Sequence, residues 1–99
     1  LQLLAVNTEA QNAVITFPSN SISVGQLIEE IEKQTDYLVV YSNREIDTNR
    51  QVIIQNKSAK VSSYLKETLA KVGIGYKFEN DYIILSKNTS LLDRYNKKK

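Results

Sequence analysis

The sequence predicts a single α+β domain that consists of two βαβ repeats and an extra strand in a C-terminal hairpin. The first observation is an internal repeat: a shift that places Ile15 on Val52 also places Val24 on Val61. The second is that both halves have the same order of short apolar strand, polar turn, amphipathic helix and second strand. Repeated units of this kind bury their apolar faces against one another. The third is the length of 99 residues, which suits one domain with one small core.

The first half begins with a short strand and a capped helix. Residues 14–17 are β-branched or aromatic, and the proline that follows ends the strand because proline cannot extend a central ladder. Residues 19–21 form a polar turn cluster. Ser23, with Gln26 three residues later, has the spacing of a capping box. We therefore expect a helix from about residue 24 to residue 34.

The apolar side chains of this helix repeat at the spacing that places them on one face, and its charged side chains fall outside that face. The face consists of Val24, Leu27, Ile28 and Ile31. Residues 38–41 then form a continuous apolar run of strand length, which is consistent with burial on both faces. A polar loop over residues 42–50 follows, with Ile46 as its one apolar side chain.

The second half repeats this plan with a wider helix face. Residues 52–54 form its first strand. Its helix carries on one side Val61, Tyr64, Leu65, Thr68, Leu69 and Val72. Gly73 stands where a left-handed C-terminal cap belongs.

The end of the second half has the pattern of a β-hairpin. Tyr76 and Phe78 alternate on one strand, Asn80 and Asp81 form the turn, and residues 82–85 return. One alternative is that Tyr76 and Phe78 stack on bases, because RNA-binding sheets carry aromatic side chains interleaved with basic ones. The favoured interpretation places both side chains inward, as the core face of a half-buried strand.

Composition excludes several kinds of site. Residues 13–87 contain equal numbers of basic and acidic side chains, whereas a nucleic-acid-binding domain normally has a basic face. The chain has no Cys and no His, which removes thiolate metal sites, disulfides and histidine bases. Glu29, Glu30 and Glu32 have the pattern of a solvated helix face. We therefore expect no enzyme, no cofactor and no metal site, and no apolar run is long enough for this domain to insert into a membrane.

The remaining candidate for function is a protein-binding surface. Small sheets have exposed edges, and an extended partner can add a strand there. The two halves differ most in the polar loop over residues 42–50 and in the strand over residues 82–85. The candidate partner-binding residues are accordingly Asn43, Arg44, Glu45, Asp47 and Tyr82.

The domain is expected to span residues 13–87, with both ends of the chain outside it. Residues 1–12 begin with an apolar stretch and are either the remnant of a secretory signal peptide or a disordered N-terminus. Thr8-Glu9-Ala10 is similar to a small-residue cleavage site. Residues 88–99 are expected to be a linker or a disordered tail.

Several short motifs occur in one consistent order along both halves. The first half contains Ile15-Thr16-Phe17-Pro18, Ile22-Ser23-Val24, Leu27-Ile28, Gln34-Thr35-Asp36-Tyr37 and Val40-Tyr41. The second half contains Val52-Ile53-Ile54, Val61 through Leu65, Leu69, Gly73-Ile74-Gly75-Tyr76 and Asp81-Tyr82-Ile83-Ile84-Leu85. This order resembles the STN domain, the secretin and TonB N-terminus module. The resemblance implies a fold in which two helices lie side by side between two small sheets, one of two strands and one of three.

The resemblance also implies a location and a role. STN domains lie in the periplasm, as parts of outer-membrane proteins. The chain would be the N-terminal signalling domain of a TonB-dependent outer-membrane transporter, relaying ligand occupancy to the periplasmic region of an inner-membrane anti-sigma regulator. Its second partner would be the plug and barrel of the parent receptor. The alternatives are a periplasmic assembly domain of a secretin and, from another class, a small KH-like nucleic-acid-binding module.

Two positions depart from the repeat or from the family pattern. Lys60 stands at the position that corresponds to Ser23, so the second helix is expected to lack a side-chain cap at its start. Asp36 stands where glycine is common in the family and where the second half has Gly73. We therefore expect Asp36 to adopt the left-handed cap conformation.

Overall fold

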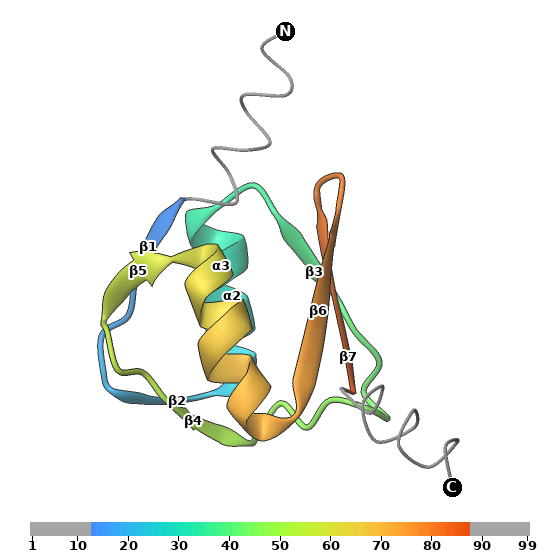
Figure 1. Cartoon of the computed structure of the whole chain (residues 1–99), viewed down its shortest axis with the longest axis horizontal. Coiled ribbons are helices and arrows are strands. Elements are labelled where there is room, and N and C mark those ends of the chain that lie inside the picture. The colour runs from blue at the N-terminus through green and yellow to red at the C-terminus, as the bar shows by residue number, and fades with distance from the viewer. Residues whose placement is uncertain (1–12, 88–99) are drawn as a thin grey trace, which may run out of the picture.

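The computed structural model describes residues 13–87, which form a small α+β fold with two helices and several short strands. Two helices lie side by side between a narrow two-stranded ribbon and a three-stranded sheet (Figure 1). The elements are β1 (Val14–Thr16), β2 (Ser21–Ser23), α2 (Val24–Gln34), β3 (Leu38–Val40), β4 (Gln51–Ile53), β5 (Ser58–Lys60), α3 (Val61–Ser63), η1 (Tyr64–Leu69), η2 (Ala70–Val72), β6 (Ile74–Glu79) and β7 (Tyr82–Lys87). The predicted fold class is confirmed.

The ribbon consists of two antiparallel pairs, β1 with β5 and β2 with β4. Between the pairs, the Phe17 N–H donates to the Lys57 carbonyl at 2.7 Å, and the Ile54 N–H donates to the Asn20 carbonyl at 2.6 Å. Pro18 lies in the interruption and has no N–H to contribute to a ladder. The expected two-stranded sheet is therefore present as an interrupted ribbon, and β2 and β5 are strands that the sequence pattern missed.

The internal repeat is present in the structure, and its two copies are crossed. The shift found in the sequence carries β1 onto β4, β2 onto β5, α2 onto the second helix and β3 onto β6. The same shift maps Val14 onto Gln51 and Ser23 onto Lys60. The pair Val14–Lys60 therefore corresponds to the pair Gln51–Ser23. Each repeat thus pairs its first strand with the second strand of the other repeat. Neither repeat can form its part of the ribbon alone.

The first helix begins and ends as a consequence of side-chain hydrogen bonds. It spans Val24–Gln34, as predicted. At its start, the Gln26 N–H donates to the Ser23 hydroxyl oxygen at 3.1 Å, and the Ser23 N–H donates to the Gln26 side-chain oxygen at 2.9 Å. This is the expected capping box. The predicted apolar face of α2 is buried in the core.

The prediction of a left-handed Asp36 is wrong. Among residues 13–87, the positive φ angles belong to Asn80 and Gly73. The helix is closed instead by Thr35, whose hydroxyl donates to the Ile31 carbonyl at 2.6 Å and accepts the Tyr37 N–H at 3.1 Å. Because this hydroxyl satisfies the end of the helix, the chain leaves in an extended conformation and needs no glycine.

The second helix consists of α3, η1 and η2, and its central segment η1 is a π-helix. Lys60 precedes it without a side-chain cap, and Gly73 follows it with φ +77°, both as predicted. The Tyr64 hydroxyl donates to the Asn56 carbonyl at 2.6 Å, and its ring packs edge-on against Phe17. Burial raises the pKa of Tyr64. No helix of the described residues is long and apolar enough to span a membrane.

The three-stranded sheet has the order β3-β7-β6, with β3 parallel and β6 antiparallel to β7. The β6–β7 hairpin turns at the predicted position, where Asn80 has φ 56°. The prediction that residues 38–41 are buried on both faces is wrong: Val39 is buried, but Leu38 and Val40 are 54% and 46% exposed. The reason is that the helices cover only one face of this sheet (Figure 1).

The strand β6 bears out the core interpretation for one of its two aromatic residues. Phe78 packs against the core and lies 5.3 Å from the ring of Tyr37. Tyr76 shares this side of the strand but is 37% exposed, and its ring meets Phe78 edge-on at 5.7 Å. The buried end of this face is Ile74, next to the second helix.

Candidate functional site

The loop over residues 42–50 is fixed to the start of α2. The Val24 N–H donates to the Arg50 carbonyl at 2.8 Å, and the Gly25 N–H donates to the Thr48 carbonyl at 2.9 Å. These bonds satisfy two of the amides that every helix leaves free at its start. Ile46, the one apolar side chain of the loop, is buried in the core. The loop therefore has a defined position despite its polar sequence.

Hydrogen bonds within the loop also define its shape. The N–H groups of Glu45 and Ile46 both donate to the Ser42 carbonyl at 3.0 Å. Further along, the Asn49 N–H donates to the Asp47 carboxylate at 3.0 Å, and the Arg50 N–H donates to the Asp47 carbonyl at 3.1 Å. Such local turns restrict the backbone before any ligand arrives.

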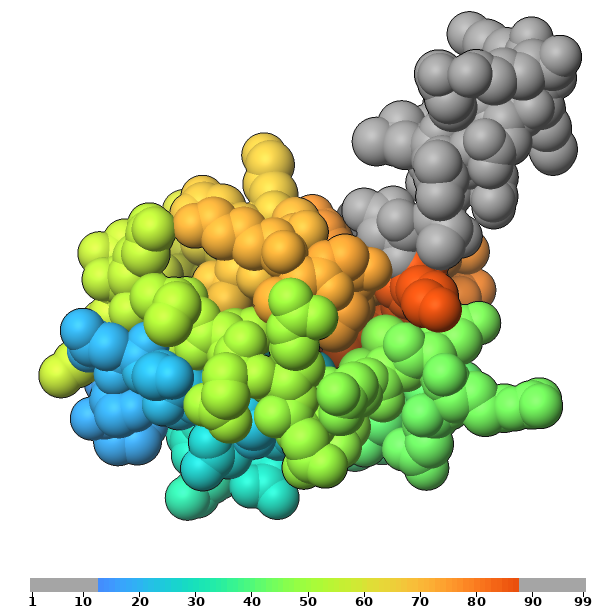
Figure 2. Space-filling model, turned by 90° about the horizontal axis from the view of Figure 1, so that it is seen from below, coloured from blue at the N-terminus to red at the C-terminus, as the bar shows by residue number. Residues whose placement is uncertain are grey.

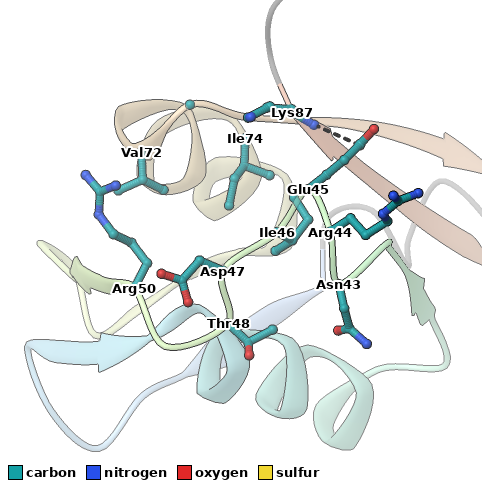
Figure 3. A pocket seen from close by; sticks show the side chains of 11 residues that line it. Asn43, Arg44, Glu45, Ile46, Asp47, Thr48, Arg50, Val72, Ile74 and Lys87 are labelled. Carbon is teal, nitrogen blue, oxygen red and sulfur yellow. Dashed lines mark hydrogen bonds between the residues drawn. The ribbon is translucent and has the colours of Figure 1, made fainter.

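The loop forms one wall of a cavity of about 720 Å³, which we call the loop pocket (Figure 3). The opposite wall comes from the end of the second helix, the start of β6 and the end of β7. The lining residues are Asn43, Arg44, Glu45, Ile46, Asp47, Thr48, Arg50, Val72, Gly73, Ile74 and Lys87. Figure 2 shows the green loop region next to the red-orange end of β7. The volume lies in the range of pockets that bind small molecules or side chains.

The structure brings together four of the five predicted partner-binding residues and separates the fifth. Asn43, Arg44, Glu45 and Asp47 all line the loop pocket. Tyr82 is 45% exposed and lies at the start of β7, whereas Lys87, which lines the pocket, lies at the end of that strand. Within residues 13–87, no acidic cluster is arranged to hold a metal ion.

Several pocket residues were missed by the sequence pattern. Arg50 directly ends the loop, so its proximity to Asp47 in the chain was a usable signal. Lys87 reaches the pocket because the parallel pairing of β3 with β7 brings the end of β7 beside the loop, and Ile74 because it pairs with Lys87. Val72 precedes them at the end of the second helix. No local pattern contains these strand pairings.

A second surface is the outer side of the three-stranded sheet, which we call the sheet face. It consists of Leu38, Val40, Tyr82 and Ile84, which lie as the neighbouring pairs Leu38–Tyr82 and Val40–Ile84. The first three are exposed and Ile84 is half-buried. On the β6 side, the sheet face is bordered by the exposed ion pair between Lys77 Nζ and Glu79 Oε1 at 3.9 Å.

The two edges of this sheet differ in how they are covered. At the β3 edge, the Val39 N–H donates to the Glu32 carboxylate at 2.9 Å, so this donor is occupied. At the β6 edge, no described strand pairs with the side away from β7. The hairpin closes with the pair Glu79–Tyr82, and the backbone groups of Phe78 therefore point toward that open edge.

In comparisons with known proteins, no family model, no curated protein and no solved structure matches this chain.

Proposed function

We propose that this chain is the periplasmic N-terminal signalling domain of a TonB-dependent outer-membrane transporter. In this role it relays ligand occupancy of the barrel to the periplasmic region of an inner-membrane anti-sigma regulator through protein–protein contact. The motif order in both halves supports the proposal, because it resembles that of the STN domain. The α+β arrangement of two helices between a ribbon and a sheet agrees with the fold that the resemblance implies.

The observation that carries the proposal is the sheet face. Leu38, Val40 and Tyr82 expose about half of their surfaces on one side of a sheet whose other side carries the buried Val39, Ile83 and Leu85. Contiguous exposed apolar patches on small proteins mark interaction sites. The charged border formed by Lys77 and Glu79 corresponds to the polar rim that surrounds the apolar centre of protein interfaces.

The mechanism is a change in the availability of this surface. When the parent receptor changes state, the domain is either held against its own plug and barrel or released to the regulator. A ligand of the barrel then shifts the population of the free domain rather than altering its fold. The balanced charge of residues 13–87 favours a protein partner over nucleic acid.

The test is a calorimetric titration of the 99-residue chain with the periplasmic region of the anti-sigma regulator encoded beside its gene. Leu38→Ser and Tyr82→Ser should each weaken binding by about tenfold or more, as truncation of a central interface residue does. The matched control is Ile53→Ser, because Ile53 is an exposed apolar strand residue on the ribbon, 63% exposed. Equal weakening by all three variants, or by none, would contradict the role of the sheet face.

Two further observations separate the alternatives. A gene that continues beyond Lys99 into a plug and a long barrel supports the transporter, whereas further ring-forming modules indicate a secretin. A salt-dependent affinity for single-stranded oligonucleotides would support the KH-like alternative and count against the proposal.

A further inference from the structure

We infer that the loop pocket binds an acidic segment of a partner protein, in which carboxylate side chains flank an apolar residue. This inference rests on the proposed function in one respect: it takes the occupant to be a protein. It assigns to the pocket a chemistry distinct from that of the sheet face, and the two surfaces can therefore be tested separately.

The first argument concerns the positive charges that line the pocket. Arg44, Arg50 and Lys87 line it. Among residues 13–87, the ion pair within 4.0 Å is the one between Lys77 and Glu79, which lies on the sheet. None of the three pocket cations therefore has an anionic partner in the described part of the chain.

The second argument concerns the two acids of the pocket, each of which accepts a backbone N–H. The Asp47 carboxylate accepts the Asn49 N–H at 3.0 Å. The Glu45 carboxylate accepts the Lys87 N–H at 3.4 Å, shown by the dashed line in Figure 3. Each acid thus accepts a backbone N–H of the pocket wall, and the three cations of the lining outnumber its two acids. An arginine can bind an incoming carboxylate through two parallel hydrogen bonds.

The third argument is the apolar floor between the charges. Ile46 and Ile74 are buried, and Val72 is half-buried beside them. In the view of Figure 3, Arg50 rises at the left toward Val72, and Lys87 lies above Ile74. Val72 keeps part of its surface exposed, and a purely ionic ligand would leave that surface uncovered. An apolar side chain with a carboxylate on either side matches both features.

The fourth argument is preorganisation. The loop is held by two hydrogen bonds to α2, by its internal turns and by the buried Ile46. A wall that is fixed before binding loses little conformational entropy when the ligand arrives. The pocket therefore has the means to bind a short segment without help from a large interface.

The experiment uses the ¹⁵N-labelled 99-residue chain and three end-blocked synthetic hexapeptides. In the first peptide, glutamate alternates with leucine. The second peptide has glutamine in place of each glutamate, and the third has lysine in place of each glutamate. Amide shifts should move at residues 43–50, 72–74 and 87 with the glutamate peptide alone. Raising the salt from about 20 to about 200 mM should weaken this binding, because exposed charges are screened.

Variants then test the assigned residues. Arg50→Gln and Lys87→Gln should each weaken binding of the glutamate peptide by about fivefold to tenfold, in line with the loss of a charge-assisted hydrogen bond. Lys66→Gln is the matched control, because Lys66 is an exposed cation on the second helix outside the pocket. The Lys66→Gln variant should bind the glutamate peptide with the same affinity as the unaltered chain.

Two results would overturn the inference: equal affinity for the glutamate and glutamine peptides, or shifts that map to the β6 edge or the sheet face. The same variants in the regulator titration separate the two proposals. If Leu38→Ser loses regulator binding and the glutamate peptide does not bind the pocket, the proposed function is supported and this inference is refuted. A regulator that does not bind, together with a glutamate peptide that does, refutes the proposed function and supports the inference.

Discussion

The backbone N–H of Val61 donates a hydrogen bond to the carbonyl of Ala13 at 2.9 Å, and this bond has a counterpart in the other repeat. The counterpart joins the Val24 N–H to the Arg50 carbonyl at 2.8 Å. The repeat shift maps Val24 onto Val61 and Ala13 onto Arg50. Each helix therefore begins under a carbonyl group supplied by the opposite repeat. The pseudo-symmetry of the domain extends from strand pairing to the helix starts.

The symmetry fails at one side-chain cap, and restoring it should stabilise the fold. Lys60 has φ −70° and ψ 147°, close to the φ −83° and ψ 160° of Ser23. The double variant Lys60→Ser with Ser63→Gln would copy the capping box of α2 into the second helix. We expect a gain of about 1 kcal/mol in the free energy of unfolding, measured by urea denaturation.

The control for this graft is Lys57→Ser, which removes an exposed lysine from the neighbouring turn and should leave the unfolding midpoint unchanged. The complementary change, Ser23→Ala, should cost about 1 kcal/mol because the Gln26 N–H loses its acceptor. A grafted variant no more stable than the unaltered chain would contradict the expected contribution of a side-chain cap at this helix start.

Local patterns predicted the elements of this fold that depend on local interactions. The capping box at Ser23, the apolar face of α2, the left-handed Gly73 and the turn at Asn80 all depend on contacts within a few residues. Asp36 was misjudged because the pattern of the second repeat was transferred to the first, although Thr35 supplies a different cap.

The parts that could not be predicted depend on distant segments. A continuous apolar run at residues 38–41 does not reveal that helices cover only one face of its sheet. The four loop residues of the candidate site were predicted because they are adjacent in the chain. Lys87 and Ile74 were not, since the pairings of β7 with β3 and with β6 place them opposite the loop.

Gly73 should be intolerant of a side chain for conformational reasons alone. Its φ is +77°, and a Cβ added there would meet nothing within 4 Å. Gly73→Ala should therefore lower the free energy of unfolding by about 1–2 kcal/mol, the cost of the left-handed conformation. Gly73→Asn should cost less, because asparagine tolerates this region. Equal unfolding midpoints for the alanine and asparagine variants would argue against this explanation.

Tyr64 should make stability fall at high pH. Burial raises its pKa in the folded state, so the unfolded state releases the proton first. Its contribution is fully present below the unfolded pKa of about 10 and is lost as the pH rises through the folded value. Tyr64→Phe should remove this part of the pH dependence, measured by urea unfolding at neutral and alkaline pH.

The same variant should also be less stable at neutral pH, by about 1 kcal/mol, because the Asn56 carbonyl loses its donor. Tyr82→Phe serves as the control, since Tyr82 is exposed and should retain the alkaline behaviour of the unaltered chain. An alkaline loss of stability that is identical in Tyr64→Phe and in the unaltered chain would contradict the role assigned to Tyr64.

Ile46 should couple the loop pocket to the core. Ile46→Ala removes a side chain that is 2% exposed and should cost about 2–5 kcal/mol in unfolding free energy. It should also free the loop from α2, so the Gly25 amide that donates to Thr48 should exchange its hydrogen faster. Ile53→Ala, at an exposed position of the ribbon, should change neither quantity. Retained protection at Gly25 would show that Ile46 does not anchor the loop.

The crossed ribbon also makes the loop over residues 42–50 a tether that decides whether the domain is a monomer. Every ribbon pair joins one repeat to the other, so two chains that exchange their second repeats would remake each pair without a new contact. What favours the closed monomer is the high effective concentration that the loop gives the two repeats. A loop shortened until it cannot span that distance would convert the same set of contacts into an interlocked dimer.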